Sequence, residues 1–356
     1  MKSILKKSML ALIVVLTVVS CRPRPEDDDP LFGNGVLVLS EGMYGSNGAV
    51  LSYYDIDSNA VTYDIFNDIN GRSLGDVAND MQLYGAKLYI VVNNSNTVEV
   101  VDINNGKSLS RISLVDKDGV GMMPRRIAFN EGKAYVCCYN GEVVRIDTTS
   151  LRVEATAQAG KSPEALCISN GKLFVSNSGG LDYPNYDSTI SVIDLSTFTE
   201  VEKIVVRLNP GRMGVDSYGN VYVLSVGNYY DSINPIGPCI QKISATDNQL
   251  VATYEVAASN FTIYNDMAYA YGMDNTTYAW WFKKIDLLTG SESEINTAGT
   301  NFSYPYAINV DADGNVYIGD AGYFTSNGDV YCFGSDGTKK YSFEAGVGPN
   351  TILRLK

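Results

Sequence analysis

A short pattern recurs seven times along the chain and strongly limits the folds that the chain can adopt. Each copy has one or two apolar residues, then an acidic or small residue, and then a turn, and successive copies lie 42 to 50 residues apart. The acidic or small residues are Asp55, Asp102, Asp147, Asp194, Ser244, Asp286 and Gly334. A fixed period of this length is typical of repeat proteins, in which each unit packs on its neighbours.

A second pattern runs in the same phase, with a turn before a strand-like run that carries an aromatic residue. Its copies lie at 87–89, 133–135, 172–174, 220–222, 267–269 and 315–317, with a weaker one at 36–38. Pro124, Pro163, Pro210, Pro305 and Pro349 precede further strand-like runs. No unit shows helical periodicity, and the 25 Tyr and 33 Gly favour strands joined by tight turns.

Each unit of about 46 residues therefore holds four short strands, here named A to D, which is the size of a propeller blade. The sequence predicts an all-β, seven-bladed β-propeller over residues 34–356, with four antiparallel strands per blade. An open array or an eighth blade is the alternative, and the repeat count disfavours it.

The two ends of the repeat region predict how the ring closes. The first unit begins at Val36 with a B-type strand and lacks an A strand. The chain ends with an A-type run from Pro349 to Leu353 that has no blade after it. We expect this C-terminal strand to complete the first blade, because closure removes the exposed sheet edges of an open stack.

The first twenty residues predict a signal peptide. Lys2, Lys6 and Lys7 precede an apolar run from Met9 to Val19, which is too short to span a bilayer in the usual way. A short membrane anchor is the alternative. The ending, Val-Val-Ser-Cys21, resembles the bacterial lipoprotein cleavage box, and this resemblance implies that Cys21 becomes the lipidated N-terminus.

Residues 21–33 predict an extended tether, because alternating Pro and charged residues cannot bury a core. The acidic run Glu26-Asp27-Asp28-Asp29 resembles the signal that sends Bacteroidetes lipoproteins to the outer face of the outer membrane. The resemblance implies an anchor in that membrane with the propeller facing the cell exterior. A plain solvated linker remains the alternative.

Composition excludes several classes of function. The net charge is −13 and no basic stripe is present, so we expect no nucleic-acid partner. The chain has no His, which removes Ser-His-Asp and Cys-His catalysis and imidazole metal ligands. Apart from Cys21, the cysteines fit no zinc spacing and are predicted to be small buried residues. The run from Asp311 to Asn315 imitates a calcium loop but lacks the later bidentate Glu, so we expect a turn and no metal site.

Strand polarity puts the B–C and D–A connections on one face of the ring, here called the top face. The long B–C loops, at 42–48, 178–189, 225–238, 272–281 and 320–328, are rich in aromatic residues. The candidate ligand-binding aromatics are Tyr44, Tyr183, Tyr186, Tyr229, Tyr230, Trp280, Trp281 and Tyr323. Aromatic side chains in exposed loops favour a binding partner, although packing on each other to brace the loops is the alternative.

The starts of the A strands should ring the central channel on the same face. The candidate ligand-binding residues there are Asn79, Asp80, Arg125, Arg126, Glu164, Arg212, Tyr306 and Asn350. Mixed hydrogen-bond donors and acceptors around a bowl of aromatic rings suit a large neutral or zwitterionic ligand with many polar groups.

The Leu-Tyr-Val strand, the Val-x-Val-Ile-Asp strand and the Pro at the unit starts resemble YncE-like seven-bladed propellers over residues 34–356. The opening run at 39–48 is similar to a Bacteroidetes lipoprotein branch that resembles BtuG-type cobalamin-capture proteins. This resemblance implies capture of a corrinoid such as cobalamin for a TonB-dependent transporter, without catalysis and without a cofactor. Ser244 and the missing Pro before Phe261 depart from the pattern.

Two other functions remain open at this point. A glycan- or protein-binding surface lipoprotein would use the same aromatic side chains as platforms. A propeller lactonase, lyase or glycosidase could use Glu164, Asp80 and Asn79 around a channel metal, or two acids as general acid and base.

Overall fold

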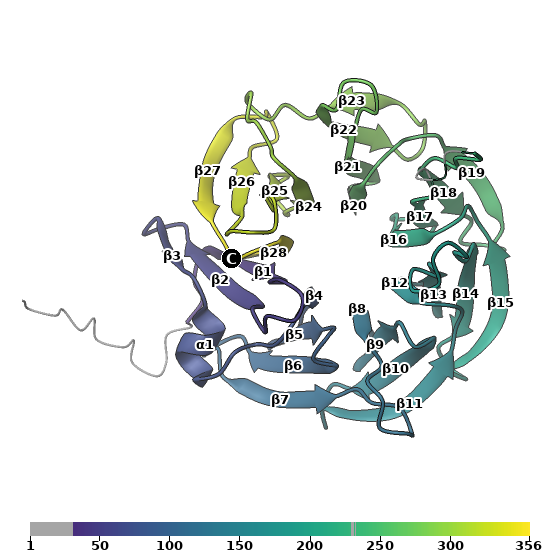
Figure 1. The fold of residues 1–356 in the computed structure, drawn as a ribbon, viewed down its shortest axis with the longest axis horizontal. Helices are drawn as coiled ribbons and strands as arrows, with labels where there is room; N and C mark the ends of the chain where they lie inside the picture. Colours follow the sequence, from purple (N-terminus) through teal and green to yellow (C-terminus); the bar gives the residue numbers. More distant parts are fainter. Residues whose placement is uncertain (1–30, 229–230, 232) are drawn as a thin grey trace, which may run out of the picture.

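The computed structural model describes residues 31–228, 231 and 233–356, so the expected signal peptide and most of the expected tether lie outside the described residues. Seven antiparallel sheets of four strands each surround a central channel (Figure 1). This arrangement confirms the predicted seven-bladed β-propeller. Within the described residues, no helix has the length and apolar character needed to cross a bilayer.

Every blade runs from an inner A strand to an outer D strand (Figure 1). The A strands of blades 1 to 7 are β28 (Pro349–Leu355), β4 (Ala78–Tyr84), β8 (Pro124–Asn130), β12 (Pro163–Ser169), β16 (Pro210–Val215), β20 (Asn260–Tyr264) and β24 (Pro305–Val310). The B strands are β1 (Gly35–Ser40), β5 (Lys87–Val92), β9 (Lys133–Cys138), β13 (Lys172–Asn177), β17 (Val221–Ser225), β21 (Met267–Met273) and β25 (Val316–Asp320). The C strands are β2 (Val50–Asp55), β6 (Thr97–Asp102), β10 (Glu142–Asp147), β14 (Thr189–Asp194), β18 (Cys239–Ile243), β22 (Trp280–Asp286) and β26 (Asp329–Phe333). The D strands are β3 (Ala60–Thr62), β7 (Ser108–Ser113), β11 (Arg152–Gln158), β15 (Thr199–Val205), β19 (Leu250–Tyr254), β23 (Glu292–Glu294) and β27 (Lys339–Glu344).

The ring closes as predicted, because β28 pairs with β1 to complete blade 1. The two strands are antiparallel, with Leu353 opposite Leu37 and Leu355 opposite Gly35. Ile352 packs in the cluster between blades 7 and 1, and Leu355 packs in the cluster between blades 1 and 2. The last strand therefore joins the first blade to both of its neighbours.

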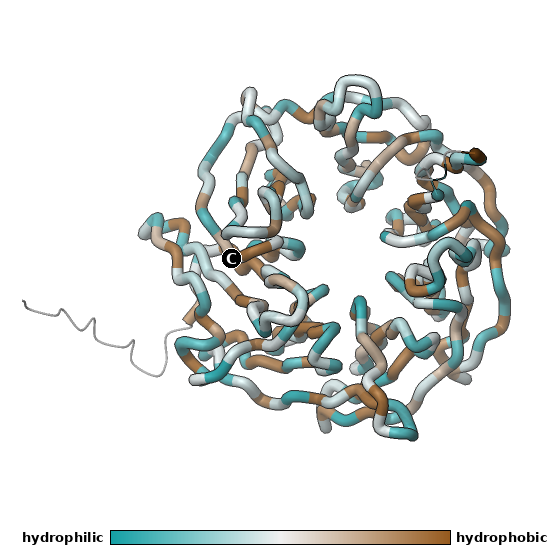
Figure 2. Tube along the Cα trace, viewed as in Figure 1, coloured by the Kyte–Doolittle hydropathy of each residue, from teal (hydrophilic) through white to brown (hydrophobic). Residues whose placement is uncertain are grey.

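The hydrophobic core lies between neighbouring blades rather than at the centre of the ring, and apolar residues are concentrated along the strands (Figure 2). The aromatic residue of the second repeat pattern is buried in six blades, at Tyr89, Tyr135, Phe174, Tyr222, Tyr269 and Tyr317. Five cysteines, at 137, 138, 167, 239 and 332, are also buried with unpaired thiols, which confirms their predicted packing role.

The repeated acidic residue stabilises turns. Asp147 ends β10, and its carboxylate accepts hydrogen bonds from the backbone N–H groups of Thr149 and Ser150. Such side-chain bonds to the backbone two or three residues ahead favour tight turns. The calcium-like run is also a turn, because Asp311 accepts from the backbone N–H groups of Asp313 and Asn315 between β24 and β25.

One element was missed by the all-β prediction. A short helix, α1 (Ile65–Asn70), lies in the connection between β3 and β4. Asp64 caps its first turn by accepting from the N–H of Asn67, and Gly71 ends it in a left-handed conformation with φ of 64°. Six residues are fewer than two helical turns, so they cannot show a 3.6-residue period in the sequence.

Candidate functional site

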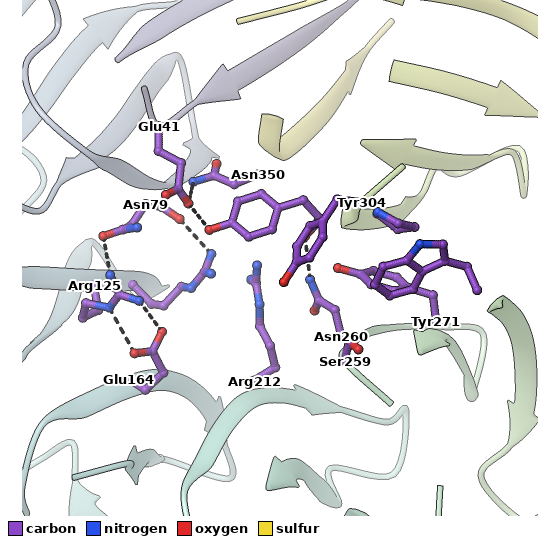
Figure 3. A pocket seen from close by; sticks show the side chains of 14 residues that line it. Glu41, Asn79, Arg125, Glu164, Arg212, Ser259, Asn260, Tyr271, Tyr304 and Asn350 are labelled. Atoms are coloured by element: carbon purple, nitrogen blue, oxygen red, sulfur yellow. Dashed lines mark hydrogen bonds and ion pairs between the residues drawn. The ribbon is translucent and has the colours of Figure 1, made fainter. Parts of the chain in front are cut away.

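A cavity of about 230 Å³ opens at the top mouth of the central channel (Figure 3). A second cavity of about 350 Å³ lies along the A strands and shares Arg212, Asn260 and Asn350 with the first. The two cavities therefore meet at the level of these three residues. The first cavity has a charged side, formed by blades 2 to 5, and an aromatic side, formed by blades 6 and 7.

A β-bulge at the start of most A strands points a side chain into the mouth. In blade 3, Pro124 pairs with Cys138 and Arg126 pairs with Cys137, so Arg125 is an extra residue outside the ladder. Asn79, Glu164, Tyr306 and Asn350 occupy the same extra position in their blades. Bulges commonly re-aim a side chain in this way.

The residue before several of these A strands has a left-handed backbone. Val77, Met123, Ser162 and Asn209 have φ of 57°, 54°, 45° and 57°. A left-handed conformation is costly for Val and Met, and such residues gather at functional sites. The same backbone conformation therefore precedes the A strands of blades 2, 3, 4 and 5.

The charged side of the mouth is built around Arg125 and Glu164. The Arg125 guanidinium donates two hydrogen bonds to Glu164, with N···O distances of 3.1 and 2.7 Å, and a third of 2.6 Å to Asn79 Oδ1. It also lies over the ring of Tyr139, 4.5 Å from the centroid, and the Tyr139 hydroxyl donates to Glu164. This two-pronged arginine–carboxylate contact fixes both side chains.

Opposing effects set the pKa of Glu164. Burial raises the pKa of this carboxyl group, but the charge and hydrogen bonds of Arg125 outweigh burial and hold the pKa below its usual value. The partner Tyr139 has a raised pKa, mainly through burial and then through the nearby Glu164 charge. Glu164 is therefore a carboxylate at neutral pH, and its proton-accepting oxygens are occupied by Arg125 and Tyr139.

Arg126 and Arg212 complete the charged side, but they differ in their partners. Arg126 donates to the backbone oxygen of Asn79 at 2.9 Å and lies 3.4 Å from Asp80. Asp80 also accepts from the backbone N–H of Ile127. Arg212 makes no ion pair or side-chain hydrogen bond with the described residues, and it points into the centre of the mouth (Figure 3).

The aromatic side is a chain of edge-to-face contacts. Trp280 contacts Tyr271 and Tyr304, with ring centroids 6.2 and 5.5 Å apart. Phe324 contacts Tyr304 at 5.5 Å and Tyr306 at 4.9 Å. Edge-to-face packing fixes each ring against the next. The aromatic side therefore consists of rings from blades 6 and 7 that pack against one another.

Glu41 links the loop after β1 to the aromatic side. Its carboxylate accepts a hydrogen bond of 2.5 Å from the Tyr306 hydroxyl and one of 3.1 Å from the Asn350 amide. Asn350 also donates to the backbone oxygen of Ala78. The carboxylate charge is thus held by two donors from blades 7 and 1.

The structure brings eight of the predicted site residues together at the first cavity: Asn79, Arg125, Arg126, Glu164, Arg212, Trp280, Tyr306 and Asn350. Asp80 lines the second cavity. Tyr44, Tyr183 and Tyr323 are 81%, 71% and 79% exposed on the B–C loops and do not line the cavity. Tyr183 packs on Tyr186, as the bracing alternative expects.

The remaining predicted residues have different outcomes. Trp281 packs with the cluster between blades 5 and 6, and Lys283 lies over its ring. Tyr229 and Tyr230 lie outside the described residues.

Sequence reasoning missed Glu41, Ser259, Asn260, Tyr271, Tyr304 and Pro305, which also line the first cavity. Asn260 could have been found from the repeat phase, because it occupies the start of the blade 6 A strand as Tyr306 does in blade 7. Its strand has no Pro and, unlike the A strand of blade 2, no bulge. Tyr271 is 3% exposed and lies in a B strand, where aromatic residues usually belong to the core.

In residues 31–228, 231 and 233–356, no group of three or more Cys, Asp or Glu side chains lies close enough to hold a metal ion. Glu164 and Asp80, the two acids considered for a channel metal, are each paired with an arginine.

Fold and mouth together define a seven-bladed β-propeller with one polar and aromatic cavity at the top of its channel. The chain belongs to the DUF5074 family, a domain family of unknown function whose model matches residues 34–286. No curated protein matches the sequence.

Solved structures share the architecture at low sequence identity. A quinoprotein alcohol dehydrogenase-like protein from Bacteroides thetaiotaomicron is 16% identical with a TM-score of 0.66, over 90% of this chain and 78% of that one. Virginiamycin B lyase from Staphylococcus aureus is 12% identical with a TM-score of 0.58, over 75% and 83%. Hydrazine synthase from Kuenenia stuttgartiensis is 18% identical with a TM-score of 0.57, over 71% and 74%. At this identity the likeness shows the fold alone.

Proposed function

We propose that the protein is a lipid-anchored capture protein on the outer face of the outer membrane, which binds a corrinoid at the top mouth and passes it to a TonB-dependent transporter. The observation that carries the proposal is the two-sided cavity, with supported aromatic rings opposite fixed polar and charged groups. A corrinoid offers matching chemistry, because it combines flat ring systems with amide groups and one phosphodiester.

The size of the cavity indicates how such a ligand would be held. About 230 Å³ is less than the roughly 300–1,000 Å³ typical of small-molecule sites, so only one end of a corrinoid would enter. The rest of the ligand would lie above the mouth, between the long B–C loops. The exposed rings of Tyr44, Tyr183 and Tyr323 on those loops are available for contact there.

Calorimetry with cyanocobalamin tests the proposal. We expect one molecule to bind per chain at micromolar protein or below. A panel of oligosaccharides in the same instrument serves as the comparison. Binding of an oligosaccharide, with no heat from cyanocobalamin, would contradict the corrinoid proposal and favour a glycan ligand. The rings on the aromatic side would then stack on sugar faces.

Two neighbouring tryptophans provide a matched pair of variants. Trp280→Ala is expected to weaken cyanocobalamin binding about ten- to hundredfold, as truncation of a buried aromatic anchor commonly does. Trp281→Ala is expected to leave affinity within about twofold and to lower the unfolding free energy by about 2 kcal/mol, because this ring packs between blades. Calorimetry and thermal unfolding of both variants check the prediction. Equal affinity loss in the two variants would contradict the assignment of Trp280 alone to the mouth.

The anchor and its location have a separate test. Cys21→Ser is expected to abolish incorporation of a palmitate analogue in growing cells and to release the protein from the membrane fraction. Protease added to intact cells should digest the wild-type protein if it faces outwards. Protection from protease in intact cells, with digestion after lysis, would place the propeller on the inner side of the membrane instead.

A further inference from the structure

Arg212 is the one charged side chain of the mouth that lacks a counterpart among the described residues. Arg125 pairs with Glu164, and Arg126 pairs with Asp80. The Glu41 carboxylate is held by two hydrogen-bond donors. Arg212 has no such contact, and it lines both cavities at the level where they meet.

The surroundings make this unpaired charge costly. Burial lowers the pKa of the Arg212 guanidinium to about 10, with a further contribution from the positive charge of Arg126. The side chain nevertheless stays protonated at neutral pH. The side chain is half-buried at the cavity, and a partly desolvated charge without a protein partner is costly. This position favours a ligand that supplies the opposite charge.

The neighbours of Arg212 indicate which chemical group of the ligand lies next to its charged group. Trp280 and Tyr304 line the same cavity on the aromatic side, and the Asn260 amide lies between the two sides (Figure 3). The Asn260 amide is held by a hydrogen bond of 3.2 Å to the backbone oxygen of Tyr306. A guanidinium presents several N–H donors in a planar fork that suits the oxygens of a carboxylate or phosphate.

We propose that Arg212, with Arg126 beside it, forms an oxyanion subsite that binds the carboxylate or phosphate group of a ligand whose adjoining planar part rests against Trp280 and Tyr304. This inference deepens the proposed function and rests on it, because it concerns the same mouth. In a corrinoid the matching group is the phosphodiester of the nucleotide loop.

The first experiment uses a small probe on the wild-type protein. Phenyl phosphate is expected to bind the purified propeller in calorimetry, with weaker binding as NaCl is raised, because a charge-assisted contact is screened by salt. Phenol, which has the same ring without the phosphate, is expected to bind at least tenfold more weakly. Equal binding of the two probes, or binding of neither, would overturn the oxyanion subsite.

Variants then locate the subsite. Arg212→Met is expected to weaken phenyl phosphate binding about ten- to hundredfold, the usual effect of losing a charge-assisted contact. Arg152→Gln serves as the matched control, because Arg152 is exposed on β11, an outer strand of blade 3. Its affinity should remain within twofold of wild type. Should Arg212→Met fail to fold, Arg212→Gln is measured in its place, and the probe comparison above stands without either variant.

A corrinoid pair separates this inference from the proposed function. Arg212→Met should weaken the binding of cyanocobalamin. It should leave the binding of dicyanocobinamide unchanged, because that corrinoid lacks the nucleotide loop and its phosphodiester. Corrinoid binding that is insensitive to Arg212→Met would remove the subsite and keep the capture function. Loss of phenyl phosphate binding in Arg212→Met, in a protein that binds no corrinoid, would keep the subsite and remove the corrinoid.

Discussion

A chain that ends at Val347 is expected to aggregate instead of forming a monomer that melts cooperatively. The truncation removes β28, so the inner edge of β1 is exposed and blade 1 is left with three strands. It also removes Ile352 and Leu355 from the clusters that join blade 1 to both neighbours. An unpaired strand edge beside exposed apolar surface is a template for association. Size-exclusion chromatography and thermal unfolding check the result.

The matched control is a chain that ends at Leu355, which loses only the exposed Lys356 and its ion pair with Asp313. This control should behave like the full chain, because exposed ion pairs contribute little. A peptide of residues 348–356 added to the longer truncation is expected to restore part of the soluble monomer. A soluble monomer that melts in one step without the peptide would show that the last strand is dispensable.

Glu164→Gln is expected to lower the unfolding free energy by about 2–4 kcal/mol at neutral pH, because it leaves Arg125 without its carboxylate partner. The two side chains are only 18% and 19% exposed, so water replaces the lost contact poorly. Glu292→Gln is the matched control, since its ion pair with Lys283 lies on the outer rim and is 38% exposed on the Glu side. That variant should cost less than about 1 kcal/mol. Denaturant unfolding of the three proteins checks the prediction.

The pH dependence of the unfolding free energy is a second test of the Glu164→Gln variant. The folded-state pKa of Glu164 is below its usual value, since Arg125 outweighs the effect of burial. The carboxylate therefore contributes stability above its ordinary pKa, and the contribution is lost as pH falls through the folded-state pKa. The difference between wild type and Glu164→Gln should shrink over that range. A constant difference down to low pH, or equal stability at pH 7, would contradict the assignment of Glu164 as the charged partner of Arg125.

The blade count, the closure and the polar part of the mouth follow from the sequence because each depends on the repeat phase. Once a unit is placed, the residue after the Pro of its A strand lies at the channel, which is how Arg125, Glu164 and Tyr306 are found. Blades 2 and 6 lack that Pro. Asn79 of blade 2 was still found, whereas Asn260 of blade 6, where the strand has no bulge, was missed.

Which of two adjacent aromatic residues reaches the mouth depends on the face of the blade to which each side chain points. The repeat pattern does not specify that face. Trp280 and Trp281 are adjacent in β22, so their side chains point to opposite faces of the blade. One face packs on blade 5 and the other on blade 7, and both are apolar. Alternation between polar and apolar positions therefore gives no sign of which tryptophan reaches the mouth. Glu41 was missed for a different reason, since the fold of a long loop determines where its side chains lie.

The bulges at the inner strands separate strand pairing from the choice of side chain at the channel. Each extra residue lies outside the hydrogen-bond ladder, so its side chain can change without altering the pairing of β4, β8, β12, β24 or β28. Relatives with this scaffold can therefore acquire a new binding preference through single replacements at equivalent positions around the ring. The residues at these bulges therefore offer a basis for grouping members of the family by the chemistry of the channel mouth.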